Sequence, residues 1–234
     1  MMKHKNSHLL VGYWSRLRKG KQLPHQTDFD PRAIKRMLAD FFILDASELA
    51  RPCYRLAGTG LCERFGFELK GTSFFAHWEA QSGAVLATLM KQSLKLRLPL
   101  CLSSIGATAD NGMVELETVL APVSWGKAEP SRFIGMVQLL SDASPLAGRT
   151  IVFERLVGSQ IVREDEPFPS FDRQIPPSLP ASGTTVRSHP RAPHLRLVVN
   201  RDRLAPVLFE SEILLERMAN ALGVEVESDS KRVS

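Results

Sequence analysis

Residues 53–75 read CYRLAGTGLCERFGFELKGTSFF, and the prediction of the fold starts from this stretch. It begins as a short apolar run typical of a buried strand, breaks at Gly58 and Gly60, and continues into a short helical pattern. Further glycines and an aromatic cluster follow. A catalytic loop, a ligand pocket and a structural corner are all compatible with a strand that passes directly into a short helix. The surrounding sequence has to distinguish them.

The segments around this stretch are strand-like and helix-like in an order that does not alternate. Residues 41–47 and 51–59 predict two strands joined as a hairpin, and residues 82–97 predict a longer helix. Asn111-Gly112 lies between two further apolar runs and is a strong hairpin signal, and a third strand follows that hairpin. This order predicts an α+β fold in which helices cover one face of an antiparallel sheet.

The N-terminal segment predicts two helices. The second begins with Asp30 as the N-cap and Pro31 in the first turn, an arrangement that satisfies free backbone N–H groups. The first, over residues 9–19, carries an apolar stripe at the i, i+3, i+4, i+7 spacing of one helical face. The stripe consists of Leu10, Tyr13, Trp14 and Leu17.

Composition divides the chain into four parts. Residues 1–40 form the N-terminal helical segment and residues 41–158 form the core. Residues 159–194 are rich in proline and serine and poor in apolar residues, which predicts a disordered linker. Residues 195–234 predict a C-terminal tail with a short strand and a helix.

Basic residues are concentrated at the N-terminus, where residues 1–36 contain nine lysines and arginines against two aspartates, a local balance of +7. Such a segment either attracts nucleic acid or an acidic membrane surface, or forms a solvated helix face. Aromatic residues are not interleaved through a long basic tract as in single-strand binders, so nucleic acid is not the expected partner. No apolar run would span a bilayer and no signal peptide is recognisable, which predicts a cytoplasmic protein.

Few residues have the spacing that catalysis or metal binding needs. The three cysteines are widely separated and form no C-x-x-C pair, so no metal site is predicted. His77 is the one histidine in the predicted core, and Cys62 is the only nucleophile worth pairing with it. A small hydrolase-like activity using His77 is the enzyme alternative. We expect instead that His77 is a hydrogen-bonded structural residue and that the chain has no catalytic residues.

Five segments together carry a family resemblance. They are YWSRLRKG, DFDP, FFILD, YRLAGTGLCERFGFELKGTSFFAHW and MVELETVLAPV. With the order of elements, they resemble a PAS domain, and most closely the subgroup of stand-alone bacterial PAS-like proteins. The resemblance covers residues 11–158. It implies a five-stranded antiparallel sheet, a cleft between the sheet and the longer helix, and a role in sensing and protein–protein signalling rather than in catalysis.

The resemblance also allows two cofactors to be checked against the sequence. Haem-binding PAS domains take an axial histidine from the longer helix, and residues 79–98 contain none. Flavin photosensors of the family carry an Asn-Cys-Arg-Phe-Leu motif, from which the local LCERFG departs. We therefore expect neither cofactor, so that purified protein is colourless, without haem or flavin absorbance.

The cleft implied by the resemblance would be lined or filled by the large apolar residues of the short helices and of the longer helix. These residues are Phe65, Phe74, Trp78, Leu86 and Met90. An open pocket would take a small apolar ligand, whereas a filled one would be part of the core.

The stripe of Leu10, Tyr13, Trp14 and Leu17 needs a surface to dock on, because an isolated helix of this length is marginal in water. One hypothesis is that the stripe forms a homodimer interface, since tyrosine and tryptophan are enriched at interface centres. The alternative is that the helix docks onto the chain's own sheet. In either case, we expect the module to act through association, with a second copy or with an unidentified signalling protein.

Overall fold

The computed structural model describes residues 2–126 and 130–163. The predicted linker from residue 164 onward and the predicted tail over residues 195–234 lie outside these ranges. Within them, three helical segments precede a strand hairpin, two helices follow it, and four further strands come next, with a short helical segment before the last.

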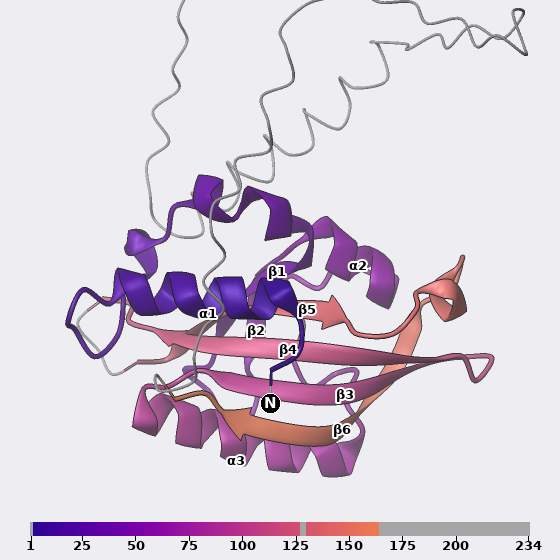
Figure 1. Ribbon diagram of the computed structural model, residues 1–234. Coiled ribbons are helices and arrows are strands. Elements are labelled where there is room, and N and C mark those ends of the chain that lie inside the picture. The colour runs from indigo at the N-terminus through magenta and orange to yellow at the C-terminus, as the bar shows by residue number, and fades with distance from the viewer. Residues whose placement is uncertain (1, 127–129, 164–234) are drawn as a thin grey trace, which may run out of the picture.

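The strands form one antiparallel sheet in the order β2-β1-β5-β4-β3-β6 (Figure 1). Their bounds are β1 Phe41–Asp45, β2 Cys53–Ala57, β3 Leu100–Thr108, β4 Met113–Val123, β5 Arg132–Leu139 and β6 Ile151–Ile161. The hairpin between β3 and β4 turns at Asn111, whose φ of 66° lies in the left-handed region that asparagine tolerates.

The α-helices are α1 Lys5–Leu17, α2 Thr59–Phe65 and α3 Ala80–Leu96, and the 3-10 helices are η1 Gln26–Asp28, η2 Pro31–Asp40 and η3 Ser144–Leu146. The helix start predicted from Asp30 and Pro31 is confirmed, since the Asp30 carboxylate accepts the N–H of Arg32 at 2.9 Å. The helix itself is of the 3-10 type, with a kink at Ile34.

The predicted α+β fold with an antiparallel sheet is confirmed, but the sheet has six strands rather than five. The sixth, β6, pairs with β3 along its whole length, with two shifts of register. These shifts and the polar residues of β6 interrupt the alternation by which strands are recognised in a sequence. The expected core boundary at residue 158 falls inside this strand, which continues to Ile161, and Val162 is also buried.

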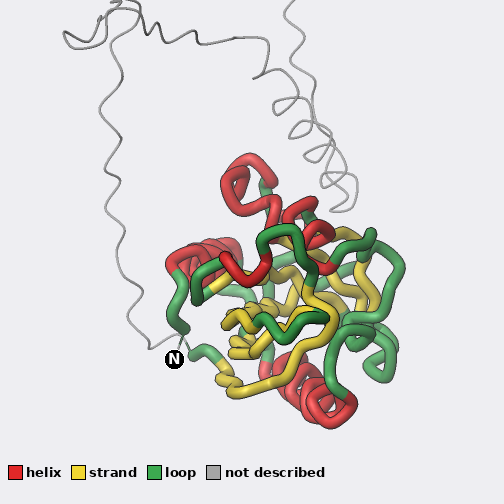
Figure 2. Tube along the Cα trace, turned by 90° about the vertical axis from the view of Figure 1, so that its right-hand side faces the viewer, coloured by secondary structure: helices red, strands yellow, loops and turns green. Residues whose placement is uncertain are grey.

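The helices between the strand hairpin and β3 cover one face of the sheet, as predicted, and the N-terminal helices pack on the other face, a docking that the sequence left open (Figure 2). α2 and α3 cover one face, and α1 and η2 cover the other. The sheet is apolar on both sides, as shown by β4, in which Leu116 and Leu120 belong to one hydrophobic cluster and Val119 and Val123 to the other. Each face therefore needs a cover.

α1 is docked on the chain's own sheet. Leu10 and Trp14 are fully buried, Tyr13 and Leu17 are half-buried against the same cluster, and the indole N–H of Trp14 donates to the carbonyl of Pro122 at 2.7 Å. Docking on its own sheet is one of the two alternatives that the sequence left open. A dimer built on this stripe would require α1 to leave the sheet.

Glu117 fixes the start of α1. The alternation of β4 suggests a solvated glutamate here, but the side chain is fully buried. Its two carboxylate oxygens accept the backbone N–H groups of Lys3 and His4 at 2.6 and 2.9 Å. Hydrogen bonds to a buried carboxylate compensate the loss of its hydration, so Glu117 holds the N-terminal segment on the sheet.

The opening stretch is a structural corner at Gly58, where β2 passes into α2. The N–H of Gly58 donates to the carbonyl of Phe41 at 2.8 Å, and this places the residue directly against η2. A Cβ atom here would lie 2.1 Å from the carbonyl oxygen of Leu38. The φ of Gly58 is an ordinary −70°, so close backbone approach, not an unusual conformation, requires glycine.

We predict that Gly58→Ala lowers the free energy of unfolding by roughly 1–3 kcal/mol, since two backbone segments must separate to admit the methyl group. The matched control is Gly83→Ala in α3, where a Cβ atom meets nothing within 4 Å. That change should stabilise the protein by about 0.5–1 kcal/mol through helix propensity. Urea denaturation of both variants measures their free energies of unfolding. Equal changes at the two sites would contradict the conclusion that close backbone approach requires glycine at position 58.

Candidate functional site

The five cleft residues predicted from the sequence lie together between the sheet and helices α2 and α3. Phe65, Phe74, Trp78, Leu86 and Met90 are at most 7% exposed and belong to one hydrophobic cluster. The rings of Phe74 and Trp78 lie 5.9 Å apart. The side chains thus fill the space that they share, and entry of a ligand among them would require them to move.

His77 lies at the centre of the aromatic part of this cluster. Its ring is 4.3 Å from that of Phe65, 6.1 Å from that of Phe74, 6.2 Å from that of Trp78 and 6.3 Å from that of Tyr54, measured between centroids. The residue is 5% exposed. The sequence places His77 as the one histidine of the predicted core. It does not indicate that four aromatic rings enclose this side chain.

A carboxylate is buried beside this histidine. Glu154 of β6 is 1% exposed, and its Oε1 lies 3.9 Å from His77 Nε2. The hydroxyl of Ser104 on β3 donates to the other carboxylate oxygen at 3.1 Å. His77 Nδ1 and Trp78 Nε1 are buried without hydrogen-bond partners. His77 Nδ1 therefore lacks the partner expected of a hydrogen-bonded structural histidine, whereas Nε2 faces the carboxylate of Glu154.

The same residues close part of the free edge of β6. The N–H of Glu154 donates to the carbonyl of His77 at 2.6 Å, and the N–H of Glu79 donates to the carbonyl of Glu154 at 2.8 Å. The N–H of Leu156 donates to the hydroxyl of Ser82 at 3.0 Å. An exposed edge is open to pairing with other strands, and these bonds block it where α3 begins. We call this set of bonds the β6 latch.

Burial shifts the pKa values in this cluster in opposite directions. It raises the pKa of Glu154 to about 7, against the lowering effect of the hydrogen bond from Ser104. It lowers the pKa of His77 to about 4. It also raises the pKa of Tyr54 well above its usual value, with a further contribution from the charge of Glu154. Near neutral pH, His77 is therefore uncharged and Glu154 is the group that titrates.

Sequence reasoning missed Glu154 and Ser104. Glu154 lies in IVFERLV, where one charged pair interrupts an apolar run, and Ser104 lies in LCLSSIG. Both are polar residues within apolar runs, a signal of burial in a strand. That signal is weak without knowledge of which strands pair.

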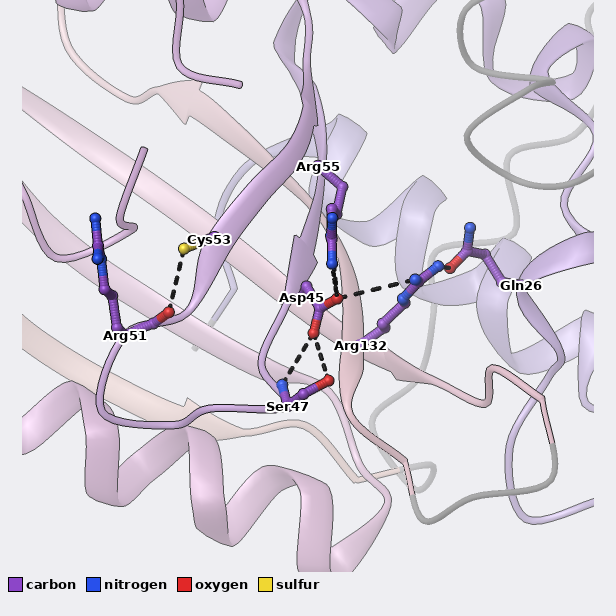
Figure 3. Close-up of polar contacts among 7 residues, drawn as sticks. All are labelled: Gln26, Asp45, Ser47, Arg51, Cys53, Arg55 and Arg132. Atoms are coloured by element: carbon purple, nitrogen blue, oxygen red, sulfur yellow. Dashed lines mark hydrogen bonds and ion pairs between the residues drawn. The ribbon is translucent and has the colours of Figure 1, made fainter. Parts of the chain in front are cut away.

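A second polar cluster ties the ends of β1, β2 and β5 together (Figure 3). Asp45 accepts hydrogen bonds from the backbone and hydroxyl of Ser47 and from the guanidinium of Arg55, and Arg132 lies 3.8 Å away. Burial raises the pKa of Asp45, but the bonds from Ser47 and Arg55 outweigh it and lower the pKa to about 2. Arg132 also donates to Gln26 at 2.9 Å. We regard this cluster as structural.

In the part of the chain that the structure describes, no helix has both the length and the apolar character of a membrane span. Histidine, cysteine and carboxylate side chains in this part form no group of three or more that would hold a metal ion.

The PAS domain family matches residues 2–138, which is more than half of the chain. The protein therefore belongs to the PAS domain family, a family of sensory and signalling modules, as the sequence resemblance implied. No curated protein matches the chain.

Solved structures similar to this chain include light-oxygen-voltage domains. One, described in a study of a flavin analogue, is 13% identical over 50% of this chain and 88% of its own, with a TM-score of 0.39. The dark structure of the blue-light photoreceptor Aureochrome1 LOV is 13% identical over 49% and 84%, with a TM-score of 0.37. The Rhodobacter sphaeroides LOV protein is 19% identical over 47% and 66%, with a TM-score of 0.35.

The shifted pKa values of Glu154 and His77 predict that the contributions of these two buried side chains to stability change with pH in opposite directions. The raised pKa of Glu154 means that its contribution to stability is complete below pH 4.5 and is lost as the pH rises to about 7. The lowered pKa of His77 means that its contribution is complete above pH 6.5 and is lost as the pH falls to about 4. The two effects oppose each other between pH 4.5 and 6.5.

We predict that Glu154→Gln becomes more stable relative to wild type as the pH rises from 4.5 to 8. The amide fits the same space and carries no charge. The gain in the free energy of unfolding relative to wild type should therefore reach roughly 3 kcal/mol, which is the free-energy equivalent of the shift in the pKa of Glu154. Urea denaturation across this range measures it, with exposed Glu115→Gln on β4 as the control. A stability difference that does not change with pH would show that Glu154 is not the titrating group.

Proposed function

We propose that this PAS domain acts as a regulatory module through protein–protein association, with a second copy of the chain as one partner. The observation that supports this is the placement of its exposed apolar side chains. Met113 of β4 and Phe153 and Val157 of β6 are 63%, 42% and 64% exposed, whereas the cleft residues are buried. Exposed apolar side chains gathered in one place are typical of interaction surfaces.

The strand register places Met113 and Phe153 on one face. Ala107 of β3 is opposite both Met113 of β4 and Phe153 of β6, and residues directly opposite in a sheet point to the same side. Val157 lies at the β-bulge further along β6. We call Met113, Ala107, Phe153 and Val157 the β-face patch. It belongs to the face on which α1 packs, but α1 lies over β4 and β5 and leaves this end uncovered (Figure 1).

β6 connects the cleft to the β-face patch. Glu154 points into the cleft cluster, while its neighbour Phe153 points to the opposite side of the sheet. A small apolar molecule that displaced side chains such as Trp78 would disturb the β6 latch, and with it the position of Phe153. In this proposal, a ligand that enters the cleft changes association through β6.

We predict that the wild-type protein is a dimer at high micromolar concentration and that Met113→Glu/Val157→Glu is a monomer. Both side chains are largely exposed, so the changes add like charges at the interface without disturbing the core. The control is Val85→Glu on α3, which is 46% exposed on the other side of the sheet and should remain dimeric. Multi-angle light scattering measures the mass. A monomeric wild type, or a double variant that stays dimeric, would refute the proposed interface.

A further inference from the structure

α1 and η2 together form a groove with a volume of about 500 Å³. Leu9, Ile34 and Met37 supply its apolar floor. The rim is basic, with Lys5 on one side and Arg32, Lys35 and Arg36 on the other, and none of the lining residues is acidic. Asp30 is the nearby carboxylate, 3.5 Å from Arg32, and both side chains of this pair are more than half exposed. The basic excess of the N-terminal sequence is thus partly concentrated around one apolar groove.

The burial pattern of η2 describes this distribution. Pro31, Ile34, Met37 and Leu38 are buried. Arg32, Lys35 and Arg36, which lie between them in sequence, are exposed. The kinked segment therefore has exposed cationic side chains beside a buried apolar side.

The walls of the groove are held by hydrogen bonds. Asn6 of α1 donates to the side chain of Gln138 at 3.0 Å, and Gln138 donates to Asp40 at the end of η2, also at 3.0 Å. Asp40 forms an ion pair with Arg64 of α2. Because these bonds link α1 to η2 through β5, the groove is formed before any partner binds, which lowers the entropy cost of binding.

Three anionic partners can be compared on this geometry. A single-stranded nucleic acid would use aromatic side chains for stacking, and the groove lining contains none. A membrane would require protruding apolar residues, but Ile34 and Met37 are only 2% and 7% exposed at the bottom of the groove. An amphipathic helix inserts apolar side chains into a groove and leaves its charged flanks at the rim. The geometry favours the helix.

We propose that the groove between α1 and η2 binds an acidic amphipathic helix of a partner protein. Apolar side chains of that helix contact the accessible Leu9 and Ala33, which lie beside the buried Ile34 and Met37, and its carboxylates pair with Arg32, Lys35 and Arg36. The inference rests on the proposed function, association, but assigns it a second surface that is separate from the β-face patch. One surface is thus available for the second copy and the other for a different protein.

The test uses a fluorescein-labelled peptide of about 15 residues, long enough to form a helix on binding. It carries leucines at i, i+4 and i+7 and glutamates on both flanks, and a second peptide has lysines in place of the glutamates. Fluorescence anisotropy with the full chain should show binding of the acidic peptide that weakens with salt, and no binding of the lysine peptide. Amide NMR shifts on binding should fall within residues 5–9 and 32–37.

The variant Arg32→Glu/Lys35→Glu/Arg36→Glu should weaken binding of the acidic peptide by about tenfold or more, because like charges then face each other. The matched control Arg51→Glu/Lys70→Glu/Lys91→Glu makes the same change of net charge at exposed sites away from the groove and should bind as wild type. Thermal melting shows whether each variant is folded.

Three results would overturn the inference. They are no binding of the acidic peptide, an equal loss in the control variant, and tighter binding of phosphatidylserine vesicles or of an oligonucleotide than of the peptide. The last result would identify the groove as a membrane or nucleic-acid surface. Light scattering of the same samples separates this inference from the proposed dimer. If the protein is a dimer but does not bind the peptide, the groove inference is refuted and the proposed function is not.

Discussion

The sheet is apolar on both faces, and the rest of the structure depends on covering them. α2 and α3 cover one face. The other is covered by α1, which is fixed at its start by Glu117 and further along by the hydrogen bond from Trp14 to Pro122. Since α1 does not extend over the β3–β6 end, apolar side chains there remain exposed. The N-terminal helix is therefore part of the fold, and its extent determines where the β-face patch lies.

β6 is the strand on which the functional proposal depends. One of its sides carries Glu154 into the aromatic cluster around His77, and the other carries Phe153 into the β-face patch. Its edge is closed near Glu154 by backbone hydrogen bonds to His77 and Glu79. Among the described residues, the buried Glu154 carboxylate accepts a hydrogen bond from Ser104, and its ionisation in this position is costly. In the proposed function, this cost links the cleft to the position of β6.

Much of this fold could be predicted from the sequence because many of its signals are local. The Asp30-Pro31 helix start and the Asn111 hairpin turn each depend on a few adjacent residues. The five residues predicted for the cleft share one buried cluster, since large apolar side chains on short helices need a common core, and their role in ligand binding stays a prediction. β6 and Glu154 were missed for a physical reason: two register shifts disturb the period of the strand, and the burial of Glu154 depends on pairing with β3, fifty residues away in sequence. Long-range pairing leaves no local signal.

The central claim, association through the β-face patch, is tested most directly by hydrogen–deuterium exchange at two protein concentrations. Dilution from high to low micromolar should dissociate the dimer and speed the exchange of backbone amides. The account predicts that this change is confined to β6 and the adjoining β3–β4 turn, while α1 exchanges equally at both concentrations. Exchange that is independent of concentration throughout the chain, or a change confined to α1, would contradict it.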